Sequence, residues 1–348
     1  MRQLLLFSIF IISFSTCIDP FDPGIDSAGR KLVVDGLLTN LPDAYTVRLT
    51  YSEPYNNDSL TLPITQATVY IADDLGNRFD LQHVTQGNYL SDKTVFQGTL
   101  GRTYTLHIQT PDGKKYQSQP EKMLAPPPID TVFTRFVETT DSREVSTYYF
   151  DAYVRTQDPK ETENFYQWRW THFRQLEFCQ EGWDSQARIF RQFYCCTPCW
   201  AIQRCVGSNC IRIESDLYFN GNRFESYVAQ VPFDSKEAYF IAIDQLALSE
   251  QTYRFWQTVN QQLNNTGGIF DVPPAAAVGN IFNPADPEEQ VLGIFNVAGA
   301  TRKAVYLRRD YVNKTPITKK TPEPKVPQFN CTQCNESLFR TNNKPEGW

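Results

Sequence analysis

Nine cysteines are the residues of this chain whose type and spacing could do chemistry, and Cys17 has the clearest context. It follows the basic start Met1-Arg2-Gln3, an apolar stretch at residues 4–14 and the small pair Ser15-Thr16. This order is typical of an export signal, and the stretch is shorter than the roughly 20 apolar residues that cross a bilayer. We therefore expect residues 1–16 to be a lipoprotein signal peptide, with the Cys17 thiol forming a thioether to diacylglycerol. An ordinary secretory signal with an incidental cysteine is the alternative.

The other eight cysteines form an even set, which in an exported chain indicates disulfides. They are Cys179, Cys195, Cys196, Cys199, Cys205, Cys210, Cys331 and Cys334. The CxxC spacings at 196–199 and 331–334 are also those of zinc ligands. Because the export signal favours an oxidising compartment, we expect disulfides and no metal or cofactor, while the pairing stays open.

Catalytic motifs are the next question. The three histidines, His83, His107 and His172, form no HExxH pair, and no GxSxG, P-loop or GxGxxG sequence occurs. Carboxylates are numerous, but no spacing selects a pair of the glycosidase kind. We expect a non-catalytic protein, with a carboxylate-dependent hydrolase of polysaccharide or peptide as the alternative.

Two tryptophans in the cysteine-rich stretch are candidate partner-binding residues. Trp183 and Trp200 lie within or beside residues 179–210, and Trp side chains on a rigid surface loop carry much of the energy of protein interfaces. The alternative is that they fill a thin core that the disulfides reinforce.

Composition limits the class of partner. The formal net charge is −6 and no basic cluster occurs, which argues against nucleic acid, since its phosphates require grouped Lys and Arg. Hydrophobic residues make up 41% of the 348 residues and aromatic residues 14%, enough for cores in two domains of usual size. No second apolar stretch has membrane length, so we expect membrane contact only through the lipid on Cys17.

The first part of the chain predicts short strands after a spacer. Residues 17–30 are rich in Pro, Gly and Asp and predict a spacer from the lipid anchor. In 31–124, strands and turns alternate, and Tyr104, Leu106 and Ile108 show the period of a half-buried strand. Six or seven short strands favour an immunoglobulin-like β-sandwich domain.

The three prolines at 126–128 mark the predicted domain boundary, because they resist both helix and central strand. Beyond it we expect a β-rich C-terminal domain at 125–312, with a Cys-rich insertion at 179–210. Residues 313–348 predict an extended C-terminal tail, which its cysteines would hold to the segment 195–210. Together with the first domain, this makes the expected fold mainly β.

Further extended segments are expected in both domains. Their β-branched and aromatic residues are typical of strands. They lie at 32–34, 45–50, 68–71, 79–81, 87–90, 148–154, 165–173, 227–231, 239–243, 291–297 and 304–307.

One amphipathic helix is expected after Ser249, which is a good N-cap residue. Tyr253, Trp256, Val259 and Leu263 follow at helical spacing. This apolar stripe predicts a helix that covers a sheet.

Several stretches together carry a resemblance to a known family. They are Cys17 with Asp19-Pro20-Phe21, residues 32–38 (LVVDGLL), Cys196 to Trp200, Tyr253-x-x-Trp256, 268–274 (GIFDVPP), 279–281 (GNI), 291–295 (VLGIF), Arg302-Lys303 and 344–348 (KPEGW). The chain resembles a family of Bacteroidota outer-membrane lipoproteins whose domain has no assigned activity (domain of unknown function 4249). The chain departs from the family at Phe295, where members usually carry Gly-Tyr-Phe around a site that is Gly293-Ile294-Phe295 here.

The resemblance implies a location and a partner, but no catalytic residues. Members are typically encoded beside TonB-dependent receptors, which implies an outer-membrane, lipid-anchored protein, either exposed at the cell surface or on the periplasmic face. We therefore expect a non-catalytic ligand-binding or accessory subunit of such a receptor, serving nutrient uptake or a surface complex. A structural or adhesion module is a further alternative.

Overall fold

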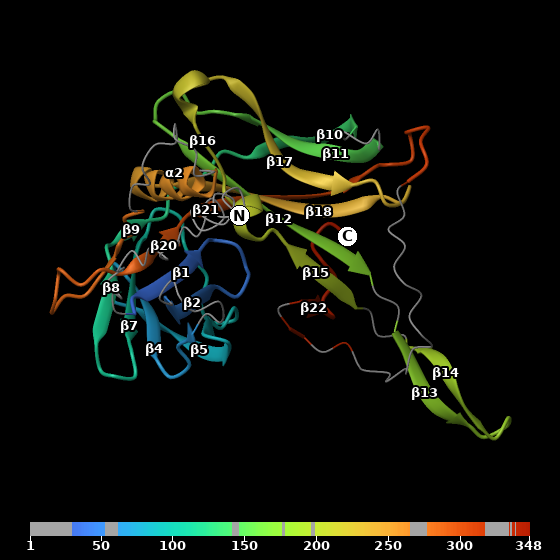
Figure 1. Ribbon diagram of the computed structural model, residues 1–348, viewed down its shortest axis with the longest axis horizontal. Coiled ribbons are helices and arrows are strands. Elements are labelled where there is room, and N and C mark those ends of the chain that lie inside the picture. The colour runs from blue at the N-terminus through green and yellow to red at the C-terminus, as the bar shows by residue number, and fades with distance from the viewer. Residues whose placement is uncertain are drawn as a thin grey trace, which may run out of the picture.

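The computed structural model describes most of the chain (Figure 1). The described residues are 30–52, 62–140, 146–175, 178–195, 199–264, 277–316, 334, 336–337 and 339–348. Strands dominate them, and they contain one α-helix, α2. The mainly β fold predicted from the sequence is confirmed. No helix within these residues is long and apolar enough to cross a membrane.

The first sheet contains eleven strands, in the order β19-β8-β7-β4-β5-β6-β2-β1-β20, with β3 beside β2 and β9 beside β7. It is nearly closed around a core that includes Val34, Leu49, Ile71 and Leu106. Its strands are β1 (Leu32–Leu38), β2 (Thr46–Tyr51), β3 (Leu62–Pro63), β4 (Thr68–Asp73), β5 (Arg78–Thr85), β6 (Asn88–Leu90), β7 (Thr103–Gln109), β8 (Lys115–Ser118), β9 (Glu121–Lys122), β19 (Ile281–Phe282) and β20 (Leu292–Val297).

Two strands of this sheet come from far along the chain. β20 pairs with β1 in parallel, from Val33↔Leu292 to Leu38↔Val297, and β19 pairs with β8. The pairing needs a glycine at 293, whose φ is +88° and whose added Cβ would lie 1.9 Å from the Val34 carbonyl oxygen. Residues 31–124 therefore do not close their own sheet. The predicted boundary near 125 is wrong in this respect, because β20 covers the edge of β1 that would otherwise be unpaired.

Two further sheets pack face to face. A three-stranded sheet has the order β10-β11-β17, and a second sheet has the order β21-β18-β12-β15-β22, with β16 beside β12. Their shared core includes Phe150, Tyr166, Trp168 and Ile241. The strands are β10 (Ile129–Thr140), β11 (Ser146–Gln157), β12 (Phe165–Gln175), β15 (Trp200–Arg204), β16 (Arg212–Ser215), β17 (Arg223–Pro232), β18 (Tyr239–Leu248), β21 (Gly299–Leu307) and β22 (Arg340–Thr341).

A buried glutamine ties these two sheets together. The Gln245 side-chain oxygen accepts hydrogen bonds from Thr156 Oγ1 and Trp168 Nε1, each at 2.9 Å, and its nitrogen donates to the Pro127 carbonyl at 2.9 Å. Gln245 is completely buried. Because a buried amide is costly unless its groups are paired, this network selects the register in which β11, β12 and β18 meet.

The predicted helix is present as α2 (Glu250–Asn264). The Ser249 hydroxyl accepts a hydrogen bond from the Thr252 amide at 3.2 Å, which confirms the predicted N-cap. Tyr253 and Trp256 pack against the cluster that contains Leu246 and Leu248. The last residue of the predicted apolar stripe does not pack against a sheet, since Leu263 is exposed in the last turn of the helix.

Candidate interaction surface

The predicted disulfide cysteines fall into three groups. Cys199 bonds to Cys334 with Cα atoms 5.6 Å apart, and Cys205 bonds to Cys210 with Cα atoms 5.2 Å apart. Cys179 and Cys195 lie on β13 (Phe178–Asp184) and β14 (Ile189–Cys195), but their side chains are outside the description. Cys17, Cys196 and Cys331 lie outside the described residues.

The first disulfide attaches the tail as expected, because Cys199 lies within the segment 195–210. Next to it, β22 extends β15 through the pairs Trp200↔Thr341 and Ala201↔Arg340. The C-terminal Trp348 ring then packs 4.9 Å from Phe240, between ring centroids. Within the described part of the tail, β22 thus forms an edge of the second sheet.

Trp200 does not have the surface position that we expected. Its side chain is only 4% exposed, and its ring lies 6.0 Å from that of Trp348. The docked tail covers it, so Trp200 contributes to the core and not to a partner surface. The sequence alone could not show this, because the covering residue is far away along the chain.

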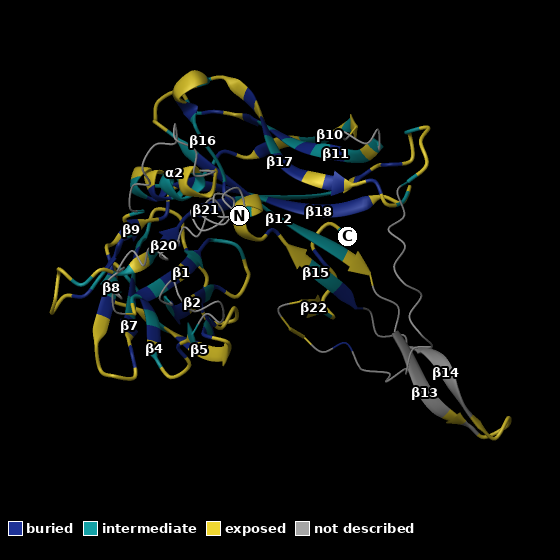
Figure 2. Cartoon of the chain, viewed as in Figure 1, coloured by how far each residue is buried: buried dark blue, intermediate teal, exposed yellow. Residues whose placement is uncertain are grey.

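Trp183 lies on a hairpin that projects from the rest of the molecule (Figure 1). β13 and β14 pair with each other and form a two-stranded sheet of their own. The register runs from Phe178↔Cys195 to Asp184↔Ile189. Trp183 is 56% exposed, and Ile189 is also exposed; Figure 2 shows the exposed tip.

This hairpin combines two features that are unusual in a structural element. An isolated two-stranded hairpin is at best marginally stable in water. This one also places a Trp and an Ile side chain toward solvent near its turn. A tryptophan on a projecting arm offers a partner a large apolar surface with few rotatable bonds. The tip of this arm is therefore the candidate interaction surface.

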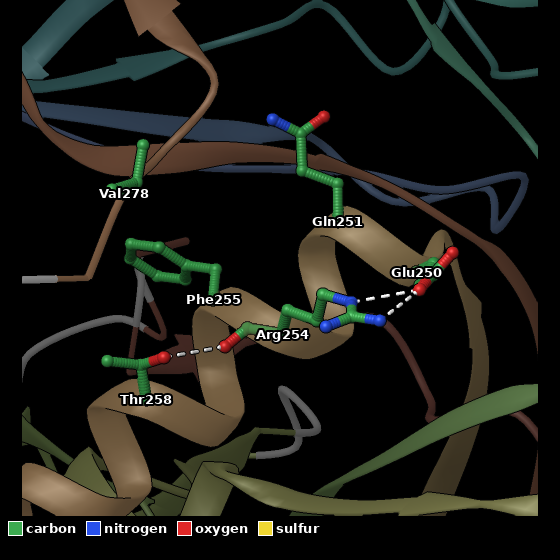
Figure 3. A pocket seen from close by; sticks show the side chains of 6 residues that line it. All are labelled: Glu250, Gln251, Arg254, Phe255, Thr258 and Val278. Carbon is green, nitrogen blue, oxygen red and sulfur yellow. Dashed lines mark hydrogen bonds and ion pairs between the residues drawn. The ribbon is translucent and has the colours of Figure 1, made fainter. Parts of the chain in front are cut away.

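A shallow pocket of about 470 Å³ lies beside α2 (Figure 3). It is lined by Glu250, Gln251, Arg254, Phe255, Thr258 and Val278. The one carboxylate among them, that of Glu250, accepts a hydrogen bond from Arg254 Nε at 2.9 Å. Thr258 donates its hydroxyl hydrogen to the Arg254 carbonyl at 3.0 Å. These six lining residues include neither a carboxylate pair nor a nucleophile beside a base.

The histidines occupy packed or exposed positions. His172 stacks on Tyr239 with ring centroids 3.8 Å apart, and its Nδ1 lies 2.7 Å from the Phe240 carbonyl oxygen. Burial lowers the pKa of His172, so its ring is held neutral. His107 stacks on Tyr70, and His83 is exposed. Within the described residues, no three His, Cys, Asp or Glu side chains gather as metal ligands.

A feature that the sequence analysis missed is the outer face of the β10-β11-β17 sheet. The Arg135 guanidinium lies 4.4 Å from the centre of the Tyr153 ring and also near Phe133. Arg135 and Arg155 both pair with Glu225. In the sequence, this face could have been found from the spacing of two residues between Phe133 and Arg135 and between Tyr153 and Arg155, because residues two apart on a strand share a face. Glu225 offsets one of the two positive charges, and the aromatic rings give both arginines further partners within the chain.

Comparison with known proteins gives one assignment. No curated protein matches the chain. The model of one family, described as a domain of unknown function (DUF4249), matches residues 18–304. Because this match spans well over half of the sequence, the chain belongs to the DUF4249 family.

Proposed function

We propose that the protein is a non-catalytic, lipid-anchored subunit at the outer membrane that serves a TonB-dependent receptor by binding its ligand or bracing the receptor. Three arguments support this proposal. The sequence up to Cys17 has the features of a lipoprotein signal. The chain resembles Bacteroidota lipoproteins that are encoded beside such receptors. The projecting β13–β14 hairpin gives the fold an arm suited to a protein partner.

The hairpin is the observation on which the proposal depends most. A partner that covered Trp183 would bury a large aromatic surface, and tryptophans at the centre of interfaces are often worth about 2 kcal/mol or more. A change of that size corresponds to roughly a 30-fold change in affinity. Trp183→Ala should therefore weaken the complex strongly without disturbing the larger sheets, because among the described strands β13 and β14 form a separate two-stranded sheet.

Affinity purification from solubilised outer membranes tests the proposal. The full-length protein should recover a TonB-dependent receptor, and Trp183→Ala should recover much less. Tyr218→Ala is the matched control, since Tyr218 is an aromatic residue that is 92% exposed on a different loop, at the end of η2 (Asp216–Tyr218). Recovery of no receptor with the wild-type protein would contradict the proposal. Equal recovery of the receptor by all three proteins would show that the hairpin does not contribute to receptor binding.

The proposed location has a separate test. Protease treatment of intact cells should cleave the protein if its hairpin faces the medium, because exposed loop tips are preferred sites of cleavage. Protection in intact cells and cleavage only after lysis would place the protein on the periplasmic face.

A further inference from the structure

Three arginines on β12, β15 and β21 share one face of the second sheet, in which β18 separates β21 from β12. Across β12, β18 and β21, Arg169 lies opposite Asp244, and Asp244 lies opposite Arg302. On β15, Arg204 lies opposite Thr171. Residues directly opposite each other point to the same side of a sheet, as do residues two apart on one strand. We call Arg169, Arg204 and Arg302 the arginine cluster.

Two carboxylates bind Arg302 through three of its five N–H donors. Its Nε donates to Asp244 Oδ1 at 2.6 Å and its Nη2 to Asp244 Oδ2 at 2.9 Å. The same Nη2 donates to Asp43 Oδ2 at 2.8 Å. This fork-shaped pairing directs both oxygens of Asp244 toward Arg302, and no hydrogen bond joins Asp244 to Arg169 in the described part of the chain.

Arg169 is the member of the cluster without such a pair. It is partly buried, and no hydrogen bond or ion pair joins it to any described residue. Burial lowers the pKa of Arg169, and the carboxylates of Asp35 and Asp244 oppose this only as neighbouring charges. A guanidinium removed from water without a hydrogen-bonded partner is unfavourable. Its five donors remain available to an acceptor.

Arg204 gives the cluster an accessible side. Its side chain is exposed, yet partial desolvation lowers its pKa. Asp43 raises the pKa, and the positive charges of Arg169 and Arg302 lower it further. The strand register places all three arginines on one face, and their positive charges act on one another there. A bound anion would relieve the repulsion and the unpaired state of Arg169 together.

We propose that the arginine cluster is a binding site for an oxyanion, a carboxylate or a phosphate group, with Arg169 as its main donor and Arg302 held in place by Asp244 and Asp43. The planar guanidinium fork matches the two oxygens of either group. This site is separate from the β13–β14 hairpin, and the proposal does not depend on the receptor partner.

Calorimetric titration of the purified full-length protein tests the site. Sodium phosphate and sodium succinate are the two probes, with sodium chloride at matched ionic strength as the blank. At least one oxyanion should bind where chloride does not, and the tighter of the two identifies the ligand class. Arg169→Gln should weaken this binding at least about tenfold. Arg78→Gln is the matched control, because Arg78 pairs with Asp80 on the first sheet, and it should bind like the wild type.

Thermal unfolding separates binding from a purely structural role. Without oxyanions, Arg169→Gln should unfold at or above the wild-type temperature, since it removes an unpaired charge. The wild type should gain stability from the oxyanion and the variant should not. Equal stabilisation by chloride, unchanged binding by Arg169→Gln, or a loss of stability in both Arg169→Gln and Arg169→Lys without oxyanions would overturn the proposal.

Discussion

Removing the Cys199–Cys334 disulfide should destabilise the protein far more than removing Cys205–Cys210. The two bonds close segments with sequence separations of 135 and 5 residues. If a disulfide acts by restricting the unfolded chain, the first contributes about 5 kcal/mol and the second about 2 kcal/mol. The first value is an upper limit, because the tail can leave the sheet without global unfolding.

Chemical denaturation of two double variants measures this difference. Replacing both cysteines of one pair with serine leaves no new unpaired thiol from that pair. Cys199→Ser/Cys334→Ser should lose more unfolding free energy than Cys205→Ser/Cys210→Ser, and its C-terminal tail should become sensitive to protease. That sensitivity follows because the contacts that would still hold the described part of the tail are few, chiefly the short β15–β22 ladder, a hydrogen bond from the Ile202 amide to the Phe339 carbonyl and the packing of Trp348. Equal losses, or a tail that stays resistant, would refute the reasoning.

Two buried polar groups give further predictions. Burial raises the pKa of Glu121 above its usual 4.5 despite a hydrogen bond from Asn280. The protonated Glu121 side chain therefore contributes stability that is fully present below pH 4.5 and is lost as the pH rises through the raised pKa. Glu121→Gln should thus be more stable than the wild type at pH 7 but not at pH 4 in denaturant titrations; parallel pH profiles would contradict this. Gln245→Leu should cost about 3 kcal/mol by unpairing the Thr156 and Trp168 donors, and a loss below about 0.5 kcal/mol would show that they find other partners.

Local patterns predicted most elements of the fold. The alternation of Tyr104, Leu106 and Ile108 became β7, and the Ser249 cap with its helical spacing became α2. All the other segments expected to be extended coincide with strands. These signals succeed because they depend on neighbours within a few residues. The long strand β10 was missed although Val132, Thr134 and Phe136 alternate inward along it.

Long-range contacts could not be predicted from the sequence. Nothing near Leu292 indicates that β20 pairs with β1, which is why the predicted boundary near 125 failed. Trp183 and Trp200 looked equivalent, and only the docked tail distinguishes the buried residue from the exposed one. The immunoglobulin-like topology of the first domain stays a prediction.

Site-specific photo-crosslinking in intact cells tests the central claim most directly. A photoreactive amino acid in place of Trp183 should crosslink to a TonB-dependent outer-membrane receptor, identified by mass spectrometry. The same amino acid at position 218 should give no such product. A receptor adduct that forms at 183 alone is the predicted result, whereas adducts with no receptor at either position would contradict the proposed role as a receptor subunit.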